Sequence, residues 1–176
     1  MTSTSTRTHQ WRGLIEEYRD RLPVSDSTPV ISLREGGTPL VRANIVSDRT
    51  GCEVWLKVEG SNPTGSFKDR GMTVAISKAA EDGAQAVICA STGNTSASLA
   101  LYCGVSKLMD AIIFIGSGKI SYGKLSQALD YGALTLQIAG DFDDAMMRVQ
   151  QVSEQLGIYL VNSVNPFRLE GQKTIM

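Results

Sequence analysis

Beyond residue 66, short apolar segments alternate regularly with helical segments, and this rhythm constrains the fold more than any other feature of the chain. Strand-length apolar runs occupy residues 86–89, 111–115, 134–138 and 158–161. Helical patterns are expected at residues 67–80, 95–102, 121–131 and 142–156. Continuous apolar strands that alternate with helices are typical of a parallel sheet buried on both faces. The pattern therefore predicts an α/β fold, a parallel sheet with helices on both faces.

The first third of the chain follows a different pattern. Apolar residues recur at helical spacing over residues 11–22, and Pro23 then interrupts the pattern, so we expect one amphipathic helix that packs on a larger body. Residues 36–40 predict a turn, and residues 53–58 alternate like a strand.

Composition excludes several classes of function. The chain has 17 Lys and Arg against 18 Asp and Glu, so no basic excess suggests nucleic-acid binding. Its three cysteines form no C-x-x-C pair, which argues against a disulfide framework and a thiolate metal site. No apolar run is long enough to cross a membrane. We therefore expect a cytoplasmic protein that acts on small molecules.

The only histidine, His9, lies near the N-terminus. Triad hydrolysis and His-ligated zinc or iron sites need an imidazole placed in a site, so these chemistries are disfavoured and no metal is expected. Lysine, hydroxyl, amide or cofactor chemistry remains.

Residues 61–71, which read SNPTGSFKDRG, present Lys68 at the expected start of a helix. A lysine becomes nucleophilic when a shielded or cationic setting lowers its pKa. Arg70 offers a nearby positive charge and Phe67 an apolar wall, so Lys68 is a candidate for Schiff-base formation. The alternative is that Lys68 is one solvated charge among several.

A second candidate loop follows the strand expected at 86–89. Ligands of parallel sheets bind at the carboxyl ends of strands, where helix N-termini offer free N–H groups. Hydroxyl and amide side chains gather at this point: Ser91, Thr92, Asn94 and Thr95. They could hold a carboxylate, although the same residue types also serve as simple N-caps.

Residues 118–124 match the spacing G-x-x-x-x-G-K, but Leu125 stands where a phosphate-binding loop needs a hydroxyl for magnesium. An ATP site is therefore disfavoured. Asp141 and Asp144 resemble a capping arrangement at a helix start.

The lysine segment 61–71 resembles that of fold-type II pyridoxal-phosphate enzymes, whose architecture is like that of the tryptophan synthase β subunit. Together with residues 91–98, STGNTSAS, it most closely resembles threonine synthase. Residues 162–174, NSVNPFRLEGQKT, resemble a segment that separates threonine synthases from serine or threonine dehydratases.

This resemblance implies the conversion of O-phospho-L-homoserine and water to L-threonine and phosphate with pyridoxal 5'-phosphate. Lys68 would hold the cofactor and shuttle protons. Asn94 would bond the ring hydroxyl of the cofactor and would also contact the substrate. The substrate carboxylate would be held by Ser91, Thr92 and Thr95. The substrate phosphate would be held by Asn162, Ser163 and Arg168, with a contribution from Lys119 or Lys124.

The chain is about half as long as members of that family, so the resemblance implies that the C-terminal half of the large domain is missing. We expect residues 1–66 to form an arm and part of the large domain, 67–165 the small α/β domain, and 166–176 the return into the truncated large domain. The chain would then be a fragment, a non-catalytic remnant, or one half of a split enzyme. A homodimer, association with a missing C-terminal half, and a dehydratase-like activity are further alternatives.

Overall fold

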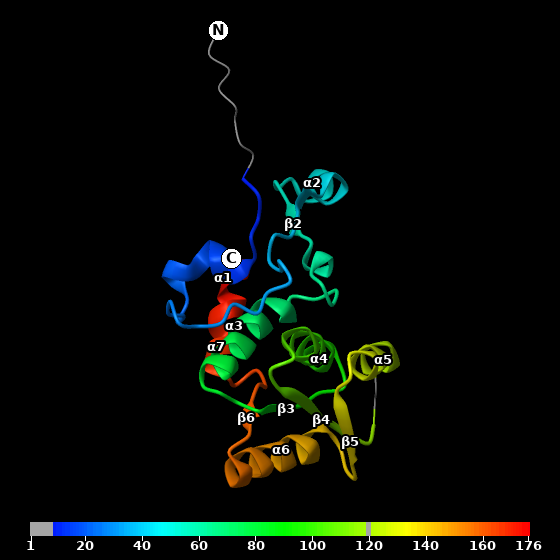
Figure 1. Ribbon diagram of the computed structural model, residues 1–176. Coiled ribbons are helices and arrows are strands. Elements are labelled where there is room, and N and C mark those ends of the chain that lie inside the picture. Colours follow the sequence, from blue (N-terminus) through cyan, green and yellow to red (C-terminus); the bar gives the residue numbers. More distant parts are fainter. Residues whose placement is uncertain (1–8, 119–120) are drawn as a thin grey trace.

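The computed structural model describes residues 9–118 and 121–176, and four parallel strands form its centre (Figure 1). The sheet has the order β5-β4-β3-β6. Its strands are β3 (Ala86–Ala90), β4 (Asp110–Gly116), β5 (Leu134–Ile138) and β6 (Tyr159–Leu160). All three pairings are parallel, as the alternating pattern predicted.

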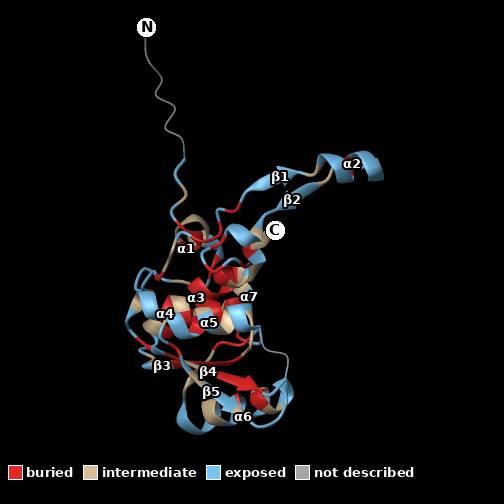
Figure 2. Cartoon of the chain, turned by 90° about the vertical axis from the view of Figure 1, so that its right-hand side faces the viewer, coloured by how far each residue is buried: buried red, intermediate tan, exposed pale blue. Residues whose placement is uncertain are grey.

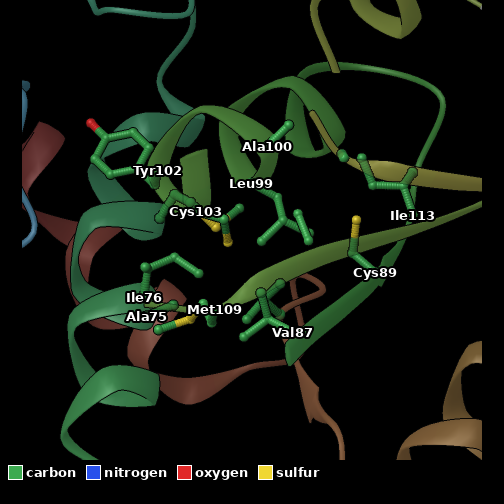
Figure 3. Packing of buried hydrophobic residues seen from close by; sticks show 14 of the residues in the cluster. Ala75, Ile76, Val87, Cys89, Leu99, Ala100, Tyr102, Cys103, Met109 and Ile113 are labelled. Atoms are coloured by element: carbon green, nitrogen blue, oxygen red, sulfur yellow. The ribbon is translucent and has the colours of Figure 1, made fainter. Parts of the chain in front are cut away.

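Helices cover both faces of this sheet, which confirms the predicted fold class. One face carries α3 (Lys68–Glu81), α4 (Asn94–Ser106) and α5 (Tyr122–Asp130), and the other carries α6 (Phe142–Leu156) (Figure 1). The larger core lies between β3, β4 and the three helices, where Ile76, Val87 and Leu99 point toward one another (Figure 3). Ile88 and Phe114 face Val149 of α6 in a second core.

The start of α6 confirms the expected capping arrangement. Asp141 accepts hydrogen bonds from the backbone of Asp143 and Asp144, and the Asp144 side chain accepts one from the backbone N–H of Asp141. These two residues therefore have a structural role.

The strand order creates a topological switch point between β3 and β6. The chain leaves β3 through α4 on one face and returns to β6 through α6 on the other. Adjacent loops separate at such a point, and ligands of open parallel sheets bind in the crevice that results. The loops that begin at Ser91 and Val161 border this crevice.

Helix α7 (Pro166–Gln172) crosses α3 at unusually close range. A Cβ atom on Gly171 would lie 2.2 Å from the carbonyl oxygen of Arg70, and a Cβ on Gly71 would lie 2.6 Å from that of Arg168. The two glycines thus permit backbone contact between the helices. A short 3₁₀ turn, Lys173–Ile175, ends the chain.

The N-terminal helix is shorter than the pattern over residues 11–22 suggested. Helix α1 covers Leu14–Tyr18, and a 3₁₀ turn follows at Arg19–Arg21. Leu14 and Ile15 are fully buried against Val74 of α3, so the segment packs on a larger body as expected.

An arm of residues 40–58 extends away from this body (Figure 2). It contains β1 (Leu40–Arg42), α2 (Asn44–Thr50) and β2 (Trp55–Lys57), and the two strands pair antiparallel. The strand expected at 53–58 is present, whereas α2 and β1 were not predicted. A 3₁₀ turn, Glu59–Ser61, leads from the arm to the lysine loop. Several large apolar side chains of the arm are exposed: Leu40, Val41, Ile45, Val46, Trp55 and Leu56.

Candidate active site

Lys68 is the first residue of α3 and follows a loop whose side chains alternate between buried and exposed. Asn62, Thr64 and Ser66 are buried, and each of these three polar side chains makes a hydrogen bond. Gly65 adopts a positive φ of 77°, a conformation that favours glycine. The loop is therefore anchored from within by its polar side chains.

The environment of Lys68 favours the neutral amine. Burial lowers the pKa of the half-buried lysine, and the positive charge of Arg168 lowers it further. The Nζ atom also lies 4.4 Å from the centroid of the Phe67 ring, a contact that favours the charged amine and opposes the other two effects. The net pKa lies below the ordinary value of a lysine.

The cation that acts on Lys68 is Arg168, which corrects the sequence-based interpretation that named Arg70. The Arg70 guanidinium is 1% exposed and forms a bidentate pair with Glu59 at 2.7 and 2.8 Å. It also donates to the carbonyl oxygens of Gly36 and Thr174. Arg70 is therefore a structural residue that joins distant segments.

Arg168 lies on α7 and is fully buried. Its Nη1 atom donates to the carbonyl oxygen of Val161 at 3.0 Å. Its Nε and Nη2 atoms have no hydrogen-bond partner among the described residues. Unpaired buried donors are costly, and burial lowers the pKa of this arginine. The arrangement suits a guanidinium that receives an anion.

Asn162 and Ser163 follow β6 but differ in their surroundings. The side-chain amide of Asn162 accepts from the N–H of Ala90 at 3.0 Å and donates to its carbonyl oxygen at 2.9 Å. It therefore continues the pairing of β6 with β3, and a direct contact to substrate phosphate would require these two bonds to break. Ser163 is exposed beside it.

The second candidate loop connects β3 to α4. Gly93 is the N-cap residue of α4, so no side chain caps this helix. The Ser91 hydroxyl accepts a bond from the N–H of Gly93, and the Ser96 hydroxyl donates to the Gly93 carbonyl oxygen. Thr92 is half-buried, Asn94 exposed and Thr95 buried. The loop thus shapes its own turn and leaves the first N–H groups of α4 without a side-chain cap.

Lys124 lies on α5 and reaches the lysine loop. Its Nζ atom donates to the carbonyl oxygen of Thr64 at 2.7 Å and to Oε1 of Gln127 at 3.1 Å. The structure thus brings Lys124 to Thr64, and its proposed contact with substrate phosphate stays a prediction. Lys119, the alternative, lies outside the described residues.

Sequence reasoning missed the buried carboxylates around this site. Asp69 is fully buried, and burial raises its pKa although Ser98 and Thr64 donate hydrogen bonds to it. Glu35, also fully buried, accepts a bond from the hydroxyl of Tyr102 at 2.8 Å. Because the periodic pattern does not distinguish a paired carboxylate from a solvated one, the sequence contained no clear signal for either residue.

The described part of the chain contains no group of three potential metal ligands and no helix that is long and apolar enough to span a membrane.

Comparison with known proteins places these features in a family. The family model described as pyridoxal-phosphate dependent enzyme matches residues 31–176. Over 94% of the chain, the sequence is 59% identical to the threonine synthase of Synechocystis sp., of which it covers 44%. It is 54% identical to the threonine synthase of Mycobacterium tuberculosis, over 99% of the chain and 49% of that protein.

Solved structures agree with this result. The processed form of threonine deaminase isoform 2 from Solanum lycopersicum superposes with a TM-score of 0.70 at 28% identity, over 78% of this chain and 38% of that chain. The chain thus has the fold-type II architecture and spans about half the length of the curated relatives it matches. On this evidence, the chain belongs to the pyridoxal-phosphate dependent enzyme family.

Proposed function

We propose that this chain supplies the lysine-bearing part of a threonine synthase, a pyridoxal-phosphate-dependent lyase that converts O-phospho-L-homoserine and water to L-threonine and phosphate. The similarity to threonine synthases supports the reaction class. The observation that carries the proposal is the buried guanidinium of Arg168, which has two unpartnered donors and acts on the pKa of Lys68. A site with these features suits a substrate that contains both an amine and a phosphate.

The residues present fit pyridoxal phosphate. Lys68 is half-buried, its pKa is lowered by burial and by Arg168, and it is the first residue of α3. A neutral amine is what attack on an aldehyde requires. Lys68 would hold the cofactor through Nζ, and Asn94, exposed at the first position of α4, would bond the ring hydroxyl.

Binding of the substrate would divide between the two loops. Hydroxyl groups of Ser91, Thr92 and Thr95, together with the first N–H groups of α4, would hold the carboxylate. Arg168 would hold the phosphate through Nε and Nη2, and Ser163 is exposed at the neighbouring turn. Asn162 would act mainly by fixing that turn to β3, and Lys124 would contribute a further positive charge.

Lys68 would also move protons. When bound, pyridoxal phosphate supplies an electron sink that stabilises negative charge next to the substrate amine. An amine whose pKa is lowered by burial and by Arg168 can accept a proton from carbon and return it. The same residue would therefore serve for attachment and for acid–base chemistry.

The test of the proposal is the visible absorption spectrum of the chain with pyridoxal phosphate. Borohydride reduction and peptide mapping then identify the lysine that carries the cofactor. We expect a new absorption band and a modified Lys68, both lost in Lys68→Ala and retained in the exposed control Lys107→Ala. We also expect O-phospho-L-homoserine to shift the band.

Other results would overturn the proposal. A chain whose Lys68 stays unmodified, both alone and in the presence of the C-terminal half of a threonine synthase, would be a non-catalytic remnant. A chain whose band responds to serine or threonine and not to O-phospho-L-homoserine would be dehydratase-like.

The domain division and the partners belong to the same proposal. Residues 1–66 would form an arm and part of a large domain, 67–165 the small α/β domain, and 166–176 the return to the large domain. The exposed apolar side chains of the arm favour association, either as a homodimer or with a C-terminal half. The three free cysteines favour a cytoplasmic location.

A further inference from the structure

Thr64, in the middle of the lysine loop, has all three of its polar groups bound by charged side chains. Its N–H donates to Oδ2 of Asp69 at 2.7 Å, and its hydroxyl donates to Oδ1 of the same carboxylate at 2.7 Å. Its carbonyl oxygen accepts from Nζ of Lys124 at 2.7 Å. Thr64 is 2% exposed, so water does not compete appreciably for these bonds.

The two charged residues come from different helices. Asp69 directly follows Lys68 on α3, and Lys124 lies on α5. Asp69 also accepts a bond from the hydroxyl of Ser98 at 2.6 Å. Ser98 belongs to α4, whose N-terminus carries the candidate carboxylate-binding loop. Three helices are thus joined to the lysine loop through one threonine and one aspartate.

These contacts hold the start of α3, where the N-cap residue provides no side-chain hydrogen bond. Phe67, the N-cap residue of α3, makes no side-chain capping bond. The Asp69 carboxylate instead reaches back five residues to the N–H of Thr64, and its negative charge in the first turn is favourable with respect to the helix dipole. The carboxylate of Asp69 and the hydroxyl of Ser66, which accepts a bond from the N–H of Lys68, thus both hold the start of α3.

We propose that Asp69 and Lys124 are positioning residues that hold Lys68 through Thr64, so that the amine keeps a fixed relation to the N-terminus of α4. The importance of this relation for catalysis rests on the proposed function. The hydrogen bonds themselves do not depend on the proposed function. The positioning role of Asp69 and Lys124 and the proposed function can therefore be disproved separately. Lys124 thereby has a role in addition to the anion contact that the resemblance implied.

The first measurement is amide hydrogen exchange of the lysine loop, followed by mass spectrometry. Lys124→Met should speed exchange in peptides that cover residues 61–67 about tenfold, the effect of losing one hydrogen bond from a charged group. Peptides from β4 and α6 should exchange as in the parent chain. The exposed control Lys107→Met should change neither region.

The second measurement is the pKa of Lys68, read by NMR after reductive methylation with labelled formaldehyde and needing no cofactor. In Lys124→Met and in Thr64→Val we expect this pKa to rise toward the ordinary lysine value as the loop loosens and the amine gains solvent. Thr64→Ser keeps the hydroxyl and should restore the parent value. A purely structural role would reduce global stability and leave the pKa unchanged.

Asp69→Asn tests the same contact from the other side, with the exposed Asp48→Asn as its control. If Asp69→Asn does not fold, the variants Lys124→Met, Thr64→Val and Thr64→Ser test the positioning role. Unchanged loop exchange together with an unchanged Lys68 pKa in Lys124→Met would overturn the proposal and leave Lys124 as an anion ligand only. Failure of the parent chain to bind the cofactor, both alone and in the presence of the C-terminal half of a threonine synthase, would contradict the proposed function and leave the exchange result valid.

Discussion

Besides the burial of the lysine itself, the guanidinium of Arg168 lowers the pKa of Lys68. Both residues stand three positions before the glycines at which their helices cross, Gly71 and Gly171. The close crossing of α3 and α7 thus brings together the two helices that carry these side chains. The protonation of Lys68 therefore depends on the positive charge of Arg168.

Replacement of Arg168 by Met should raise the pKa of Lys68, although burial will still hold it below the ordinary value. At a pH below the pKa, a rise of one unit would reduce the neutral amine, and with it the reaction rate at Lys68, about tenfold. The measurement is the pH dependence of Lys68 modification. The exposed control Arg148→Met should leave the dependence unchanged, and an unchanged dependence in Arg168→Met would contradict the electrostatic link.

The glycine crossing gives a prediction about stability. Gly171→Ala places a methyl group 2.2 Å from a backbone oxygen of α3, and overpacking of this kind costs about 1–3 kcal/mol or more. Gly123→Ala is the matched control, because that glycine also lies in a helix and a Cβ there meets no atom within 4 Å. It should be neutral or stabilising by up to about 1 kcal/mol. Chemical denaturation measures both effects, and equal effects would contradict the close crossing.

Asn162 should matter more for folding than its exposed neighbour. Asn162→Ala removes both hydrogen bonds to Ala90 and leaves the backbone N–H and carbonyl oxygen of Ala90 without this partner. The free energy of unfolding should fall by about 2–3 kcal/mol. Ser163→Ala should change stability by less than about 0.5 kcal/mol, as expected for a surface position. Thermal unfolding of the two variants compares them directly. Equal stability of both would contradict the structural role of Asn162.

The pair formed by Glu59 and Arg70 predicts a pH dependence. Burial alone would raise the pKa of Glu59, but the hydrogen bonds from Arg70, Thr38 and Asn62 outweigh it, and the net pKa lies below the ordinary value. A lowered pKa in the folded state contributes stability above the unfolded pKa of about 4.3, and this contribution is lost as the pH falls through the folded value.

Glu59→Gln should therefore destabilise the chain by about 3 kcal/mol at neutral pH, because it leaves Arg70 buried without its partner. The difference in the free energy of unfolding between Glu59→Gln and the parent chain should shrink below about pH 4. Urea titrations over a range of pH measure it, and a difference that does not depend on pH would contradict the assignment.

The repeating part of the fold was predictable because each of its strands is a short apolar run bounded by polar loops. The same pattern placed Lys68 at a helix start and residues 91–95 at a strand end, where the structure has them. Helix α2 escaped prediction because it has seven residues and exposes Ile45 and Val46. So short a segment contains too few periods for its apolar pattern to identify it.

The polar contacts of the site could not be predicted in the same way. Asp69 and Glu35 are buried charges whose partners lie up to 67 residues away in the sequence, as for the bond between Tyr102 and Glu35. The burial of Arg168 depends on the crossing of α3 and α7, which is a tertiary feature. Sequence spacing indicates which residues share an element, whereas the partner of each polar group is decided by packing.

The guanidinium of Arg70 also joins the base of the arm to α3. It holds Thr38, just before β1, and Glu59, just after β2, so both ends of the arm's base are fastened to one side chain on α3. The base of the arm is therefore attached to the first turn of α3, two residues after Lys68.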